Sequence, residues 1–197
     1  MEPVTLTSER LLLRPLGPQD TDAVHAAAQD PAIQRWTTIP SPYARSDAET
    51  FAGQIAPQSW KAGTEYCFAI FPRNALGREP GPLLAVMGVM ARGQGAAEIG
   101  FWAVAEHRGH GFVTEGLLRL ARWAFTQAGI DRLEWRAEVG NTASRAVAER
   151  AGFTIEGTLR AGLVNKGTRR DAWIGSLLPS DLGLPATLPH LPAPARP

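Results

Sequence analysis

The seven residues from Arg108 to Thr114 combine two glycines with the predicted start of a helix, a pattern that can bind an anion. Gly109 and Gly111 let the backbone approach a ligand closely, because no Cβ stands in the way. A helix start presents unpaired N–H groups and the positive end of the helix dipole at the same place. Pyrophosphate is the usual guest of such a site. A short glycine motif also occurs in loops that only turn the chain, so both interpretations stay open on the motif alone.

The segments on either side of this loop predict the elements that position it. Residues 97–104 are predicted to form a strand, and a turn at 93–95 joins it to an antiparallel strand over 83–91. Residues 114–128 place apolar side chains three and four positions apart, which predicts a helix with one buried face. Residues 133–139 alternate apolar and charged, as a half-buried strand does. A strand, a helix and a strand in this order indicate a parallel pair with a right-handed crossover.

The remaining segments complete one mixed α/β (α+β) domain. Short helices are predicted around residues 21–28 and 47–60, and a second short helix after Asn141. From Pro179 onward the sequence has no periodicity. We therefore expect one domain over residues 1–179 and a proline-rich tail without a core over 180–197. Further strands are predicted over residues 5–16, 65–71, 154–160 and 171–178.

The composition is that of a globular protein and excludes several classes. The formal net charge of +1 argues against nucleic-acid or membrane binding driven by bulk charge. No apolar run has the length of a transmembrane helix, and no secretory segment follows Met1. The one cysteine, Cys67, excludes an internal disulfide framework and is typical of a cytoplasmic protein. It lies in a predicted strand, where a buried small side chain is the simpler interpretation.

Three stretches resemble one enzyme family in the same order and spacing. The run Arg108-Gly-His-Gly-Phe-Val-Thr-Glu resembles the acetyl-CoA pyrophosphate loop of the GNAT N-acetyltransferases, whose pattern is Gln/Arg-x-x-Gly-x-Gly/Ala. Val113 stands where that family has a small residue. Residues 9–15, together with 141–144, 151–153 and 156–157, resemble the RimJ/RimL branch of the family. The resemblance covers about residues 4–179.

The resemblance implies a fold and a cofactor site. The fold would be a mixed central sheet of about six or seven strands, with a splayed central pair and flanking helices. Acetyl-CoA would be the cosubstrate, and its pantetheine arm would pair with the edge of the strand that precedes the loop. Backbone N–H groups at that edge would then stabilise the oxyanion. The implied cofactor-binding residues are Trp102, Ala103, Val104, Arg108, Gly109, His110, Gly111, Phe112, Val113, Thr114, Asn141 and Ser144.

Acetyl transfer to an amine needs a proton acceptor, because an amine with a pKa near 10.4 is almost wholly charged at pH 7. Glu98 is the first candidate, since it lies on the strand a few residues before the expected thioester position. An exposed strand carboxylate at a hairpin is the structural alternative. Glu134, Glu138 and Asp171 are weaker candidates.

Ser144 is the predicted proton donor to the departing thiolate. Many family members use a tyrosine in the second motif, but none lies between Asn141 and Phe153, and Ser144 is the RimJ/RimL-like match. A role in capping the helix is the alternative for Ser144, as it is for Asn141.

The sequence therefore predicts an acetyl-CoA-dependent N-acetyltransferase that acts by direct attack of a primary amine. The acceptor is a protein N-terminal amine or a small amine, and the protein is a monomer or a homodimer. The alternative is a GNAT-fold module that binds acyl-CoA without turnover. The four histidines show no zinc spacing, so we expect no metal. A P-loop nucleotidase is excluded because no Gly-Lys-Ser/Thr follows the glycines.

Overall fold

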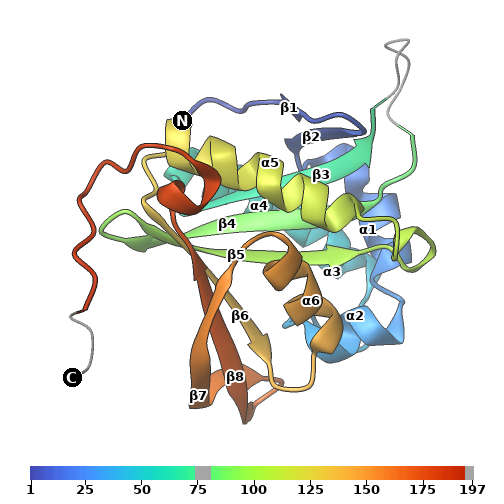
Figure 1. Ribbon diagram of the computed structural model, residues 1–197. Helices are drawn as coiled ribbons and strands as arrows, with labels where there is room; N and C mark the ends of the chain where they lie inside the picture. Colours follow the sequence, from blue (N-terminus) through green and yellow to red (C-terminus); the bar gives the residue numbers. More distant parts are fainter. Residues whose placement is uncertain (74–80, 194–197) are drawn as a thin grey trace.

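The computed structural model describes residues 1–73 and 81–193 as an eight-stranded sheet with helices on both faces (Figure 1). The strand order is β1-β2-β3-β4-β5-β6-β8-β7. The strands are β1 (Leu6–Thr7), β2 (Leu11–Pro15), β3 (Glu65–Pro72), β4 (Ala85–Gly93), β5 (Ala96–Ala103), β6 (Arg132–Glu138), β7 (Thr154–Asn165) and β8 (Thr168–Leu177). Every neighbouring pair is antiparallel except β5 and β6, as the hairpin turn and the crossover helix predict.

The helices divide between the two faces of the sheet (Figure 1). The long helix α5 and the short α6 lie on one face, here called the α5 face, and α1 to α3 lie on the other, the α1 face. The helices are α1 (Thr21–Ala27), α2 (Pro31–Trp36), α3 (Arg45–Thr50), α4 (Ala56–Ala62), α5 (Phe112–Gln127) and α6 (Thr142–Arg150), with a π-helical turn η2 (Phe51–Ile55) between α3 and α4. Short 3-10 turns are η1 (Pro18–Asp20), η3 (Ala105–His107) and η4 (Pro179–Leu182).

The central parallel pair is splayed, which confirms the expected fold. Strands β5 and β6 pair only from Ala96↔Arg132 to Glu98↔Glu134. Beyond this point β5 continues to Ala103 and β6 to Glu138 without pairing to each other. The two strands therefore leave a gap in the middle of the sheet, and its β5 side ends at η3 and the glycine loop.

The sheet has one strand more than expected because the first predicted strand is broken. A turn at Ser8, closed by the Ser8 N–H bond to the Leu11 carbonyl at 3.0 Å, separates β1 from β2. The predicted helix over residues 47–60 is also built differently. It continues from α3 into α4 through the π-helical turn η2, so Gly53 and Pro57 do not end it.

Two apolar clusters fill the two faces. The larger one packs α5 and α6 onto the sheet, with Trp123 and Trp135 fully buried within it. The smaller one joins α1, α3 and η2 to the opposite face and contains Cys67, which is 2% exposed. No helix within residues 1–73 and 81–193 is both long and apolar enough to cross a membrane.

The predicted proline-rich tail begins with a segment that is attached to the domain. Leu182 and Leu184 pack against the larger cluster, so the first tail residues do contribute to a core. Farther along, the Thr187 N–H donates to the Asp131 carboxylate at 2.9 Å. The sequence does not reveal this attachment, because only two leucines make it and the surrounding stretch has no hydrophobic periodicity.

Candidate active site

The glycine loop has the geometry of an anion cradle. Gly109 and Gly111 adopt φ values of +79° and +78°, which glycine reaches without strain. Gly111 is the residue before α5, and the first backbone bond of the helix runs from the Glu115 N–H to the Gly111 carbonyl at 3.0 Å. Within the described chain this leaves the N–H groups of residues 112–114 without a helical acceptor. The helix begins at Phe112, two residues before the predicted start.

Arg10 holds the loop from the N-terminal side, a contact that sequence reasoning missed. Its guanidinium donates to the His110 carbonyl at 3.1 Å and to the Glu115 carboxylate at 2.6 Å. Glu115 also accepts from the Ser8 hydroxyl and the Arg10 N–H. Burial opposes ionisation of Glu115, but these hydrogen bonds outweigh it and lower the pKa of the carboxyl. A Cβ built on Gly111 would lie 3.5 Å from the Arg10 guanidinium, so this group lies directly beside the cradle while its charge is paired with Glu115.

Arg108 has a structural role in addition to its place in the motif. Its guanidinium donates to the Ala103 carbonyl at 3.0 and 3.2 Å and also bonds to the Asp30 carboxylate. The second oxygen of Asp30 caps α2 by accepting from the Ala32 N–H at 2.7 Å. Arg108 therefore ties the loop to the end of β5 and to the start of α2.

The unpaired edge of β5 presents backbone donors to the gap. The Val104 N–H donates to the Leu84 carbonyl at 3.0 Å and thus points toward β4. Because donors alternate along an antiparallel strand, the N–H of Trp102 also points toward β4, and those of Ala103 and Phe101 point into the gap. Of the three predicted edge residues, only Ala103 turns its N–H toward the gap. Phe101, which the sequence analysis did not name, is the second such donor.

The second motif borders the gap on the β6 side. The Asn141 side-chain oxygen accepts from the Ser144 N–H at 3.3 Å, so Asn141 caps α6. The Ser144 hydroxyl accepts from the Trp135 indole N–H at 3.0 Å. A hydroxyl that accepts in this way keeps its own hydrogen available to donate.

The predicted carboxylates on β5 and β6 lie on the α1 face, and each of the four predicted carboxylates has partners. Glu98 bonds to Arg92 at 2.7 Å and lies 3.7 Å from Arg136. It also sits where β5 and β6 still pair, four residues or about 13 Å along the strand from Trp102. Glu134 bonds to Arg132 and Arg136. The remaining one, Asp171, accepts from the Ala161 N–H at 2.8 Å.

Glu138 is held as a charged carboxylate by Arg35. The two side chains form a bidentate pair with bonds of 2.9 and 2.6 Å, and Glu138 is only 8% exposed. The hydrogen bonds from Arg35 lower the pKa of Glu138 despite the opposing effect of burial. A carboxylate with a lowered pKa is a weak proton acceptor, so Glu138 is better described as the tie between α2 and β6.

This tie predicts a pH dependence of stability. Because the pKa of Glu138 is lowered in the folded state, the pair stabilises the fold above the unfolded-state pKa of about 4.3 and loses that effect as the pH falls through the folded-state value. Arg35→Gln is therefore expected to lower Tm by roughly 2–4 °C at pH 7. The difference from the unchanged protein should vanish in acid.

The exposed pair of Arg45 with Asp22 supplies the control for this measurement. Arg45→Gln should leave Tm almost unchanged at every pH, because exposed ion pairs contribute little. Equal losses for the two variants, or a loss for Arg35→Gln that persists in acid, would refute the role given to Glu138.

Glu65 is a carboxylate that the sequence analysis did not select. It begins β3 on the α1 face, two residues from the buried Cys67. A Cβ built on Gly88 would collide with the Glu65 carboxylate, so that group lies over the glycine. Burial raises the pKa of Glu65, and the nearby Arg92 offsets this only in part. Gly88 is paired with Gly100, which lies about 7 Å before Trp102 along β5.

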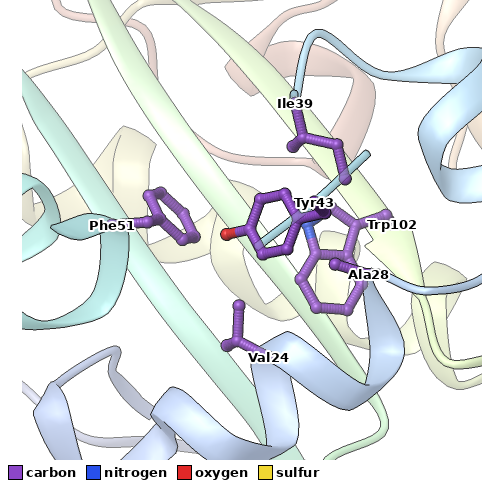
Figure 2. A pocket seen from close by; sticks show the side chains of 6 residues that line it. All are labelled: Val24, Ala28, Ile39, Tyr43, Phe51 and Trp102. Carbon is purple, nitrogen blue, oxygen red and sulfur yellow. The ribbon is translucent and has the colours of Figure 1, made fainter. Parts of the chain in front are cut away.

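An apolar pocket opens beside Trp102 on the same face (Figure 2). Its floor is buried, and its rim consists of larger side chains that are only partly buried. Figure 2 shows the Tyr43 ring between Phe51 and Trp102, with Val24 from α1 below it. The lining residues are Val24, Ala28, Ile39, Tyr43, Phe51 and Trp102.

Together, the splayed sheet and the N–H cradle at the start of α5 define the architecture of a CoA-dependent acyltransferase. A family model described as "Acetyltransferase (GNAT) domain" matches residues 10–154, which is more than half of the chain. The chain therefore belongs to the GNAT acetyltransferase family. It is an N-acetyltransferase, and acetyl-CoA is its cosubstrate.

Two relatives of this chain are also named N-acetyltransferases. The putative ribosomal N-acetyltransferase YdaF of Bacillus subtilis (strain 168) is 43% identical over 82 residues, which cover 42% of this chain and 45% of that protein. The match to YdaF thus spans less than half of that relative. The uncharacterized N-acetyltransferase p20 of Bacillus licheniformis is 29% identical over 176 residues, 88% of this chain and 96% of that protein.

Solved structures agree in fold. A putative ribosomal-protein-serine acetyltransferase from Vibrio cholerae superimposes with a TM-score of 0.77 at 21% identity, over 89% of this chain and 98% of that one. RimJ from Mycobacterium smegmatis, in complex with CoA-disulfide, gives 0.77 at 22% identity over 92% of each chain. The RimJ/RimL-like assignment made from the motifs is confirmed.

Proposed function

We propose that this acetyltransferase acetylates a primary amine by direct attack, and that a protein N-terminal amine is its acceptor. The observation that carries the proposal is the arrangement around the gap: the cradle lies at one end, and both the apolar pocket and Glu65 lie on the α1 face beside it. An amine that reaches the gap from the α1 face meets a thioester that enters from the cradle. The printed names of YdaF and of the Vibrio cholerae protein, which refer to ribosomal proteins, support a protein acceptor.

Acetyl-CoA supplies the acetyl group in this scheme and leaves as the thiol. The N–H groups at 112–114 and the Arg10 guanidinium fit its pyrophosphate, because they combine free donors with positive charge. An open groove beside the cradle, with a volume of about 580 Å³, fits its nucleotide end. The groove is lined by Ser8, Glu9, Arg10, Gly111, Thr114, Glu115, Leu118 and Arg150.

In the proposed reaction, different groups around the gap act on the amine and on the carbonyl oxygen. The amine nitrogen bonds to the thioester carbon, the C–S bond breaks, and the nitrogen gives up one proton. The N–H groups of Phe101 and Ala103 stabilise the negative charge on the carbonyl oxygen. Cys67 forms no acyl intermediate, because it is buried and burial raises the pKa of its thiol.

Two carboxylates compete for the amine's proton. Glu98, the first candidate from the sequence, forms an ion pair with Arg92 and lies farther from Trp102. Glu65 has a raised pKa, which makes it the stronger base, and it lies one strand from Gly100. We propose Glu65 as the acceptor and keep Glu98 as the alternative.

Ser144 is the proposed proton donor to the thiolate. Ser144→Ala is expected to lower kcat about 10-fold near neutral pH while acetyl-CoA affinity stays unchanged. The loss should shrink above about pH 8.5, where a thiolate leaves without a proton. A loss that is equal at all pH values would instead assign Ser144 to the support of Trp135 alone. Circular dichroism checks the fold, since the change leaves the indole N–H without its partner.

The experiment that tests the function is thiol release with peptide acceptors. The protein is mixed with acetyl-CoA and a peptide panel, and free thiol and peptide mass are measured together. We expect thiol release that depends on the peptide, with one added acetyl group at its N-terminal amine. Binding of acetyl-CoA by calorimetry without any such release would favour the second candidate, a module that binds acyl-CoA without turnover.

A further inference from the structure

The apolar pocket beside Trp102 lies one side chain away from the reacting centre. Trp102 forms a wall of the pocket, while the next residue, Ala103, turns its N–H into the gap between β5 and β6. A group attached next to the acceptor's amine therefore falls within reach of the pocket when the amine reaches the gap.

The side chains that line the pocket are mostly apolar. Val24, Ala28 and Tyr43 form a floor that is at most 5% exposed, and Ile39 and Phe51 remain partly open to solvent at the rim. In the described chain the lining contains no charged side chain. Its polar groups are the Trp102 indole N–H and the Tyr43 hydroxyl. The hydroxyl stays neutral because burial, and secondarily Asp47, raise the pKa of Tyr43 to about 12.

The size of the pocket limits its guest. The cavity volume is about 60 Å³. This is well below the roughly 300–1,000 Å³ of sites for drug-sized ligands. A single apolar side chain of medium size fits such a space, whereas a charged one would lose its water without gaining a partner of opposite charge.

We propose that this pocket is the specificity site for the acceptor, and that the preferred acceptor is a primary amine with a leucine- or methionine-sized apolar side chain next to the amine. The proposal rests on the proposed acetylation of amines. It adds what the proposed function leaves open, namely the chemical class of the first residue. The rim residues Ile39 and Phe51, which carry apolar surface exposed without a partner, are covered when that side chain is bound.

The test compares peptides that differ only in their first residue, with leucine, methionine, serine, glycine or aspartate at that position. We expect kcat/KM for the leucine and methionine peptides to exceed that for the serine peptide by about 10-fold or more. Leucinamide and serinamide form a second arm, which distinguishes a peptide from a small amine as the source of the side chain. The same preference in both arms places the recognition in the side chain itself.

Two variants locate the preference in the pocket. Ile39→Ser makes the rim polar at a partly exposed loop position, and it should reduce the leucine-to-serine ratio at least threefold. Ile55→Ser changes an exposed isoleucine outside the pocket and should leave the ratio unchanged. Ala28→Leu fills the floor and should abolish the preference, with its Tm recorded because Ala28 is buried.

The outcomes separate this inference from the function on which it rests. Acetylation of all peptides at similar rates, or a preference that Ile39→Ser leaves intact, overturns the pocket as the specificity site and leaves the acetyltransferase function standing. Binding of acetyl-CoA without acetylation of any peptide or amide overturns both. A preference for leucine and methionine that only the pocket variants weaken supports the proposal.

Discussion

Glu65→Gln is expected to lower the rate of acetyl transfer roughly 100-fold near neutral pH, the usual size of a lost general base. Glutamine keeps the shape of the side chain but cannot take the amine's proton. The loss should shrink as the pH rises toward the pKa of the amine, because a neutral amine needs no proton acceptor. The measurement is a pH profile of kcat/KM with one peptide acceptor.

Stability is the readout that separates this role from a structural one. Because burial raises the pKa of Glu65, its charged form destabilises the fold, and that cost grows as the pH rises through the folded-state pKa. Replacing the carboxylate with an amide removes this cost, so Tm at pH 7 should not fall. A variant that loses activity together with Tm would assign Glu65 to packing.

Two further variants test the assignment. Gly88→Ala places a methyl group where the Glu65 carboxylate lies and should displace that flexible side chain without removing it, with a smaller loss of rate. Glu98→Gln should have the smaller effect of the two glutamine variants. If instead Glu98→Gln alone loses about 100-fold, the carboxylate first selected from the sequence is the base, and Glu65 is not.

Gly111→Asp is expected to weaken binding of CoA more than 10-fold, or by more than about 1.4 kcal/mol. The new carboxylate would stand at the start of α5, where the cradle and Arg10 attract a pyrophosphate. It would both repel the ligand and compete for the guanidinium. Calorimetric titration with CoA measures the effect.

Asparagine at the same position is the matched control. Gly111 has a φ of +78°, and asparagine tolerates this conformation better than most residues. Gly111→Asn therefore carries the added bulk and most of the backbone strain without the charge. The aspartate variant should bind CoA clearly more weakly than the asparagine variant, and equal affinities would show that charge at this position does not matter to the ligand.

Much of the fold followed from patterns that lie within single segments. The apolar spacing of residues 114–128 predicted α5, and alternation over 133–139 predicted β6. The hairpin at 93–95 predicted the antiparallel pair of β4 and β5. The break between β1 and β2 could not be predicted from such patterns. The turn at Ser8 that makes this break is stabilised by Glu115, a residue more than a hundred positions away.

The sequence by itself determined the class of protein and the position of the N–H cradle. The cradle could be predicted because glycines, a strand end and a helix start are contiguous in the chain, and local backbone geometry alone creates the site. The motif also located Ser144 at the start of α6, where the structure has it.

Only the tertiary structure decided which side chains gather on the α1 face beside the gap. Glu65 lies on the α1 face over Gly88, next to Gly100, because three strands pair in one register. The pocket likewise gathers residues from α1, the 39–43 loop, η2 and β5. The guanidinium of Arg108, a motif residue, bonds to the Ala103 carbonyl and the Asp30 carboxylate. Contacts of this kind depend on the register and packing of segments that are distant along the chain, and no local pattern encodes them.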